Sequence, residues 1–189
     1  MDLSRLWTAL SWAWIASEVG ILLFTRTRRS SGEVQDRGSI VILWVALVAS
    51  ITLGRWIGET RPQAIFLEAH WVRVAGVAIF AGALVLRWMA VVTLGRSFSA
   101  NVAIRATQSL HTTGLYRFVR HPSYTGLIFI LFAEALRTRN WAGFAVVLIP
   151  TTAALLYRIH VEEDALRSVF GEEYAVYSRT TKRLVPGVY

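Results

Sequence analysis

The chain has 189 residues, of which 54% are hydrophobic and only 17% are charged, and its mean hydropathy is +0.46. An average globular chain carries about 25% charged residues, so this composition argues against a soluble domain. The absence of cysteine excludes disulfides, a catalytic thiol and cysteine-ligated metals. The net charge of +8 suits anionic lipid headgroups better than nucleic acid, because the basic residues are spread over loops between apolar segments.

Apolar residues gather in five segments along the chain. A transmembrane helix needs about 20 mostly apolar residues, so these segments predict an all-α membrane protein with about five transmembrane helices. No cleavable signal is expected, because the first segment contains Glu18 and is not followed by a small-residue cleavage site. The segments are Leu6–Phe24, Ser39–Ile57, Trp71–Val92, Tyr124–Leu136 and Trp141–Tyr157.

The last two segments are expected to form a tight helical hairpin. The fourth is short and ends beside Arg137 and Arg139, and the fifth begins directly afterwards. The helical pattern then continues from Leu155 to Phe170, which predicts that the fifth helix runs straight out of the membrane as a helical tail. Gly171 can end or bend that helix.

On either side of Gly171, the aromatic residues Phe170, Tyr174 and Tyr177 follow one another at helical spacing. This pattern predicts an amphipathic segment that lies on the membrane surface.

The basic residues predict the orientation in the membrane. Loops rich in Arg and Lys stay on the cytosolic side. Only Arg5, Arg61, Arg137 and Arg139 fall in segments on one side, so we expect the N-terminus outside and the C-terminal tail in the cytosol. The side predicted to be cytosolic carries Arg26, Arg28, Arg29, Arg37, Arg96, Arg105, Arg117, Arg120, Arg158, Arg167, Arg179, Lys182 and Arg183.

The stretch GLYRFVRHPSYTG, residues 114–126, is unusually polar for its position at the start of the fourth segment. A residue before proline avoids the α region and proline suits the first helical turn, so a helix should begin at His121–Pro122. We expect the N–H groups of Ser123 and Tyr124 to face the cytosol, where a helix start can hold an anion. Together with Tyr116, the rings of His121 and Tyr124 could contact an adenine ring or a sulfonium.

The alternative for this stretch is a purely structural helix entrance. Arg117 and Arg120 would then contact lipid headgroups, and His121 would cap the helix.

A second pair of candidates lies at the end of the fifth segment. Arg158 and Glu162 are four residues apart and share a helix face, so they could simply form an ion pair. However, a charge at the end of an apolar span is costly without a partner. An arginine fork can instead hold a carboxylate, and a glutamate can accept from an ammonium.

Three further charged residues, Glu18, Arg87 and Glu134, lie inside apolar segments. Intramembrane charges are functional candidates, with internal pairing as the alternative. No metal is expected, because His111, His121 and His160 lack the spacing of a metal site. There is no GxGxxG motif, which argues against a soluble dinucleotide-type fold.

Three stretches resemble the integral-membrane isoprenylcysteine carboxyl methyltransferases and the related phospholipid N-methyltransferases. They are LGRSFSANVAI, HTTGLYRFVRHPSYTG and EEDALRSVFGEEYAVYSRTTKRLVPG, within residues 94–187. We therefore expect a single domain over 1–189, with three N-terminal spans in 1–93 and a cofactor-binding core in 94–189.

The resemblance implies that S-adenosylmethionine is the methyl donor. It also implies a cytosolic cofactor pocket over the last two spans and a catalytic or substrate-positioning role for Arg158. Glu162 would contribute to catalysis and would also bind the amino acid end of the cofactor. The matched cofactor-binding positions are Gln108, Ser109, Leu110, His111, Tyr116, His121, Pro122, Ser123, Tyr124 and Glu162.

The expected function is methyl transfer to a lipid-borne acceptor at the cytosolic membrane face. The carboxylate of an isoprenylcysteine-like or other isoprenoid lipid is favoured as the acceptor. Three alternatives stay open: methylation of a phospholipid amine, an NADPH-dependent membrane reductase of the sterol-reductase type, and a small membrane carrier.

Overall fold

The computed structural model describes residues 2–25, 33–34, 36, 38–61, 70–95, 98, 103–104 and 109–189. Gln108 and the basic residues Arg26, Arg28, Arg29, Arg37, Arg96 and Arg105 lie outside these described residues. The helices are α1 (Leu3–Thr25), α2 (Ser39–Thr60), α3 (His70–Leu94), the short 3-10 helix η4 (Gly114–Arg117), α4 (Pro122–Arg137) and α5 (Trp141–Thr180). A two-residue antiparallel ladder joins β1 (Glu33–Val34) to β2 (Ala103–Ile104).

The expectation of an all-helical membrane protein is confirmed. Among the described residues, four helices, α1, α2, α3 and α5, are long and apolar enough to cross a membrane. The remaining helix, α4, has 16 residues and so extends about 24 Å at 1.5 Å per residue, which is less than a hydrocarbon core of about 30 Å. A fifth full span therefore stays a prediction.

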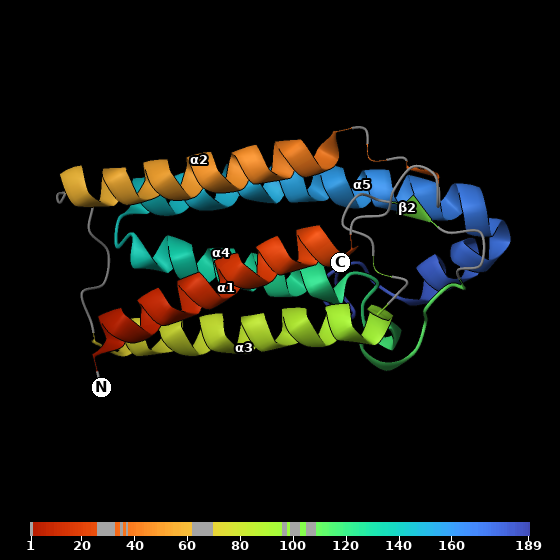
Figure 1. Ribbon diagram of the computed structural model, residues 1–189, viewed down its shortest axis with the longest axis horizontal. Coiled ribbons are helices and arrows are strands. Elements are labelled where there is room, and N and C mark those ends of the chain that lie inside the picture. Colours follow the sequence, from red (N-terminus) through yellow and green to blue (C-terminus); the bar gives the residue numbers. More distant parts are fainter. Residues whose placement is uncertain are drawn as a thin grey trace.

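The long helices run alternately up and down, and the α4–α5 hairpin is present (Figure 1). Within the bundle, however, α4 packs mainly along α3, and α5 packs mainly along α2. A glycine allows each of these helix pairs to pack closely. A Cβ on Gly126 of α4 would lie 2.8 Å from the carbonyl oxygen of Ala83 on α3, and a Cβ on Gly54 of α2 would lie 2.5 Å from Val147 on α5. The hairpin therefore places the beginning of α4 and the end of α5 at one end of the bundle.

The intramembrane charges are paired inside the protein, as the alternative for them predicted. Arg87 on α3 forms a buried ion pair with Glu18 on α1. Glu134 on α4 accepts hydrogen bonds from the indole N–H of Trp7 at 3.0 Å and the hydroxyl of Ser11 at 3.1 Å. These contacts connect α1 to α3 and α4, so the three charges contribute to helix packing.

The tail differs from the expectation for its aromatic residues. Helix α5 does continue through residues 155–170, and Gly171 breaks its regular geometry with φ 51° and ψ −121°. However, Tyr174 is fully buried, and the Tyr177 hydroxyl donates to the carbonyl oxygen of Tyr116 at 2.6 Å. The prediction that Tyr174 and Tyr177 lie on the membrane surface is wrong, because the segment folds back against the protein.

The chain after α5 also returns to the start of α4 (Figure 1). The N–H of Arg120 donates to the carbonyl of Lys182 at 2.7 Å, and the N–H of His121 donates to that of Arg183 at 3.0 Å. The residues that follow α5, 181–189, therefore form a C-terminal strap. The strap fixes the backbone directly in front of Pro122.

Candidate active site

The polar stretch before α4 folds as the sequence predicts, with one exception. Pro122 occupies the first turn of α4, and His121 has non-helical backbone angles of φ −127° and ψ 60°. The N–H of Tyr124 donates to the carbonyl of His121 at 3.0 Å, so it is used inside the turn. The prediction that this N–H holds an anion is therefore wrong.

The alternative reading of this stretch as a simple helix entrance is wrong for His121 and Arg120, whereas Arg117 is exposed and its contact with lipid headgroups stays a prediction. The His121 side chain makes no capping hydrogen bond to the backbone. Its ring is buried, stacks on the ring of Tyr124 with centroids 5.6 Å apart, and places Nε2 3.3 Å from Glu163. Arg120 points inward as well, and its guanidinium donates to Glu163 at 2.8 Å.

Glu163 organises this end of the protein and was not singled out from the sequence. Its carboxylate has no solvent exposure. It accepts from Arg120, from His121 and from Arg183, whose Nη2 lies 2.8 Å away. The hydrogen bond to Glu163 raises the pKa of Arg183. One carboxylate thus joins α5, the strap and the start of α4.

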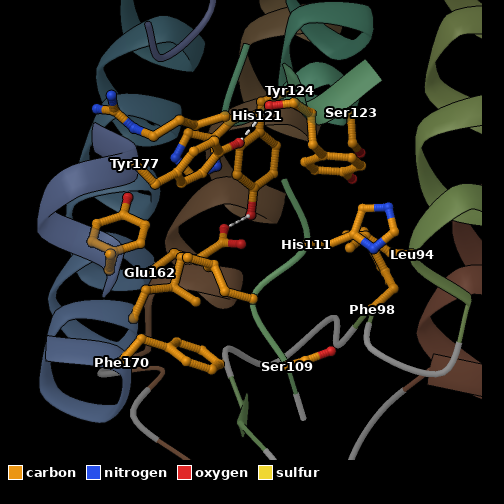
Figure 2. Close-up of a pocket in the computed structure, with 15 residues that line it drawn as sticks. Leu94, Phe98, Ser109, His111, His121, Ser123, Tyr124, Glu162, Phe170 and Tyr177 are labelled. Carbon is orange, nitrogen blue, oxygen red and sulfur yellow. Dashed lines mark hydrogen bonds between the residues drawn. The ribbon is translucent and has the colours of Figure 1, made fainter. Parts of the chain in front are cut away.

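A cavity opens beside these residues, between the start of α4 and the end of α5. Figure 2 shows His111, Leu94 and Phe98 on one side and Glu162, Phe170 and Tyr177 on the other. Eight residues predicted to bind the cofactor line it: Ser109, Leu110, His111, Tyr116, His121, Ser123, Tyr124 and Glu162. Sequence reasoning did not include Leu94, Phe98, Arg120, Leu166, Phe170, Tyr174 and Tyr177 in the lining.

Two predicted cofactor residues are not placed in this lining. Pro122 is buried in the first turn of α4 and does not line the cavity. Gln108 lies outside the described residues. The aromatic residues at the end of α5 could have been assigned to the cavity only with knowledge of the bend at Gly171, since hydropathy alone does not separate protein contacts from lipid contacts.

Burial raises the pKa of Tyr116, and the negative charge of Glu162 acts in the same direction. The Tyr116 hydroxyl therefore stays protonated, and it donates to the carbonyl of Ala90 at 3.2 Å. This hydrogen bond fixes the ring at the wall of the cavity.

The Tyr124 hydroxyl joins the two candidate residues of α5. It donates to Glu162 Oε2 at 2.7 Å and accepts from Arg158 Nε at 3.1 Å. Arg158 is buried, and its Nη1 donates to Asp36 Oδ1 at 2.7 Å and to the Ser39 hydroxyl at 2.8 Å. Arg158 and Glu162 are therefore linked through Tyr124, and Asp36 is a partner of Arg158 that the sequence did not reveal.

Arg158 lines a second cavity, which lies among the membrane helices. Tyr124 and Phe98 line both cavities and so form a shared wall. The other side chains of the second cavity are mostly hydrocarbon. They are Ile21, Leu22, Ile40, Leu43, Trp44, Leu47 and Leu127, with Glu18 and Arg87 as charged members.

Comparison with known proteins identifies the fold and the family. The family model of the isoprenylcysteine carboxyl methyltransferases matches residues 74–168. The chain belongs to the isoprenylcysteine carboxyl methyltransferase family. This family consists of methyltransferase enzymes, and the matched segment runs from α3 through the polar stretch to α5 beyond Glu162.

Similar proteins differ in the share of their own length that this chain covers. Protein-S-isoprenylcysteine O-methyltransferase B of Arabidopsis thaliana is 30% identical, over 76% of this chain and 74% of the relative. Methanethiol S-methyltransferase 1 of Bradyrhizobium diazoefficiens is 28% identical, over 78% of this chain and 54% of the relative. The chain thus spans about half of the second relative.

A solved structure supports the same assignment. The eukaryotic intramembrane Ras methyltransferase superposes with a TM-score of 0.61 and 26% sequence identity. The match covers 76% of this chain and 52% of the other. The expected resemblance to the isoprenylcysteine carboxyl methyltransferase family is therefore confirmed, and so is an integral, multi-pass membrane fold.

Proposed function

We propose that this protein transfers a methyl group from S-adenosylmethionine to the carboxylate of an isoprenylcysteine-like lipid at the cytosolic membrane face. The observation that carries this proposal is the shared wall at Tyr124. Its hydroxyl contacts Glu162 beside the polar cavity and Arg158 beside the apolar cavity. A water-soluble donor and a membrane-borne acceptor could therefore approach one another from two sides.

The polar cavity has groups that suit the methyl donor. The stacked rings of His121 and Tyr124, with Phe170 and Tyr177 opposite, offer aromatic faces to adenine and to a sulfonium. Glu162 offers a carboxylate to the ammonium of an amino acid. We assign these residues, with Ser109, Leu110, His111, Tyr116 and Ser123, to cofactor binding.

The chemistry places few demands on the protein beyond positioning. S-adenosylmethionine, when bound, supplies a methyl group on a positively charged sulfur, and an acceptor carboxylate already carries the lone pair that attacks it. Arg158 orients the acceptor carboxylate and offsets its charge. We assign the isoprenoid chain to the side of the apolar cavity, where the hydrocarbon side chains would keep water away from an acceptor placed close to the shared wall.

Other acceptors are distinguishable by direct assay. Because one relative is named a methanethiol methyltransferase, a small thiol is the second candidate. Purified protein in nanodiscs would receive radiolabelled S-adenosylmethionine with N-acetyl-S-farnesylcysteine, phosphatidylethanolamine or methanethiol. We expect label in the ester of the farnesylcysteine. Label only in the amine or only in the thiol would contradict the carboxylate assignment.

The His121→Ala substitution should weaken S-adenosylmethionine binding about fivefold, since an aromatic contact is worth about 0.5–1.5 kcal/mol. The buried ring lines the cavity and stacks on Tyr124. Calorimetry on detergent-solubilised protein would measure the affinity, and thermal unfolding would confirm the fold. His160→Ala, at an exposed histidine of α5, is the matched control. An unchanged affinity for His121→Ala would leave the ring a structural role only.

A reporter fused after Tyr189 should be active only in the cytosol. The end of α5, which borders the polar cavity, and the strap that follows it carry Arg179, Lys182 and Arg183, and such basic segments stay on the cytosolic side. The control is the same reporter at the N-terminus, which lies at the other end of the bundle (Figure 1) and should be inactive there. The reverse pattern would contradict a cytosolic cofactor site.

A further inference from the structure

The guanidinium that the proposed function assigns to the acceptor already holds a carboxylate of this chain. Asp36 lies just before α2, and its Oδ1 accepts from Arg158 Nη1 at 2.7 Å. The same oxygen accepts from the Ser39 hydroxyl at 2.8 Å. The side chains of Arg158 and Asp36 are only 4% and 14% exposed, so this ion pair lies largely out of water.

We propose that Asp36 is a specificity-determining residue that occupies the place of the acceptor's carboxylate on Arg158. A carboxylate acceptor then binds by exchange, displacing Asp36 from the guanidinium. This inference rests on the proposed function, because it requires Arg158 to receive an acceptor carboxylate.

The exchange follows from the charge of the site. A largely buried guanidinium needs a counter-charge, and a second carboxylate beside the first adds repulsion. Methyl transfer forms a bond between a carboxylate oxygen and the methyl carbon and breaks the bond from that carbon to sulfur. The acceptor loses its negative charge in this step, so Arg158 again favours Asp36. Asp36 thereby disfavours retention of the ester product.

The other arginine of the apolar cavity is less suited to exchange. Arg87 is held at two points by Glu18, through Nε with Oε1 and through Nη2 with Oε2 at 2.7 Å. Glu18 lies in the middle of α1 and also accepts from the Trp14 indole at 3.0 Å. By contrast, Asp36 contacts Arg158 through Oδ1 and lies in the turn before α2, where its backbone carbonyl accepts from the Ser39 N–H, so its side chain can rotate away without moving a residue of the helix.

The test compares two ligands that differ in one charge. N-acetyl-S-farnesylcysteine and its methyl ester would each be bound to the full chain in nanodiscs, with S-adenosylhomocysteine present so that no turnover occurs. In the parent protein, Asp36 should keep the preference for the acid over the ester small. Asp36→Asn should increase this preference at least about fivefold by tightening acid binding, because the acid then gains an uncontested charge-assisted contact. Ester binding should change little.

Three further variants make the result specific to Asp36. Asp36→Glu restores a carboxylate and should restore the small preference for the acid. Ser39→Ala removes one hydroxyl that holds Asp36 and should shift the preference in the same direction as Asp36→Asn, by about twofold. Glu172→Gln removes an exposed negative charge from the tail and should have no effect. Equal S-adenosylhomocysteine affinity in all variants would confirm that the polar cavity is intact.

Two outcomes would overturn the inference: an unchanged preference in Asp36→Asn, or weaker acid binding. Either would mean that Asp36 and the acceptor do not compete for Arg158. Failure of the proposed function gives a different result, namely no methylation of the acid by the parent protein. The Ser39→Ala variant keeps the test decisive if Asp36→Asn does not fold.

Discussion

Arg158→Lys is expected to lower methyl transfer at least about tenfold, equivalent to about 1.4 kcal/mol of barrier. Arg158 uses different nitrogens for different partners: Nε reaches Tyr124 and Nη1 reaches Asp36 and Ser39. Lysine keeps the positive charge but has a single ammonium in place of the planar fork, so it cannot hold these directions together. The lysine ammonium keeps the charge but lacks the planar hydrogen-bonding geometry of the guanidinium, so the acceptor carboxylate should be poorly aligned.

The measurement is turnover with N-acetyl-S-farnesylcysteine at saturating S-adenosylmethionine, together with donor affinity by calorimetry. Arg158→Lys should leave donor affinity nearly unchanged. Glu162→Gln is the matched variant on the same helix and should weaken donor binding, since its proposed partner is the donor's ammonium. Near-native turnover in Arg158→Lys and near-native binding in Glu162→Gln would show that both residues only support the helix.

Glu163→Ala is expected to destabilise the C-terminal strap by about 3–5 kcal/mol, the usual cost of removing one partner from a buried ion pair. The substitution leaves Arg120 and Arg183 without the carboxylate that both contact at 2.8 Å. Because the strap fixes the backbone at Arg120 and His121, donor affinity should fall as well. This effect would exceed that of His121→Ala, which leaves the two arginines paired.

Limited proteolysis after α5 and denaturant unfolding would measure the loss, and Glu163→Gln would separate charge from size. Asp164→Asn is the control, because Asp164 is the next residue and is one-third exposed. A change below about 0.5 kcal/mol in Glu163→Ala would place it with ordinary surface substitutions and would contradict the role of this carboxylate.

The helices could be predicted because membrane spans are defined by continuous apolar composition. The segment predicted as Leu6–Phe24 became α1 at Leu3–Thr25, and the break at Gly171 was visible from its residue type. Helix α4 was recognised as short, yet its packing along α3 could not be predicted. That packing depends on Gly126 meeting Ala83, a contact between segments far apart in the sequence.

The candidate site was only partly predictable for the same reason. Motif similarity found Tyr124 and Glu162, which lie together at the cavity. It did not find Asp36, because 122 residues separate it from Arg158 and it belongs to no motif. Glu163 was overlooked beside Glu162 because consecutive helical residues point in different directions, and only the fold shows which one meets the cations.

The Tyr124 hydroxyl, held between Glu162 and Arg158, connects the two cavities by hydrogen bonds, so we expect binding in one cavity to affect binding in the other. A ligand that draws Glu162 away would remove one hydrogen bond of Tyr124, and we expect the contact between Tyr124 and Arg158 to change with it. If donor binding changes acceptor affinity by some factor, acceptor binding must change donor affinity by the same factor. Tyr124→Phe, which keeps the ring and removes the hydroxyl, should therefore reduce this cooperativity more than it reduces either affinity alone.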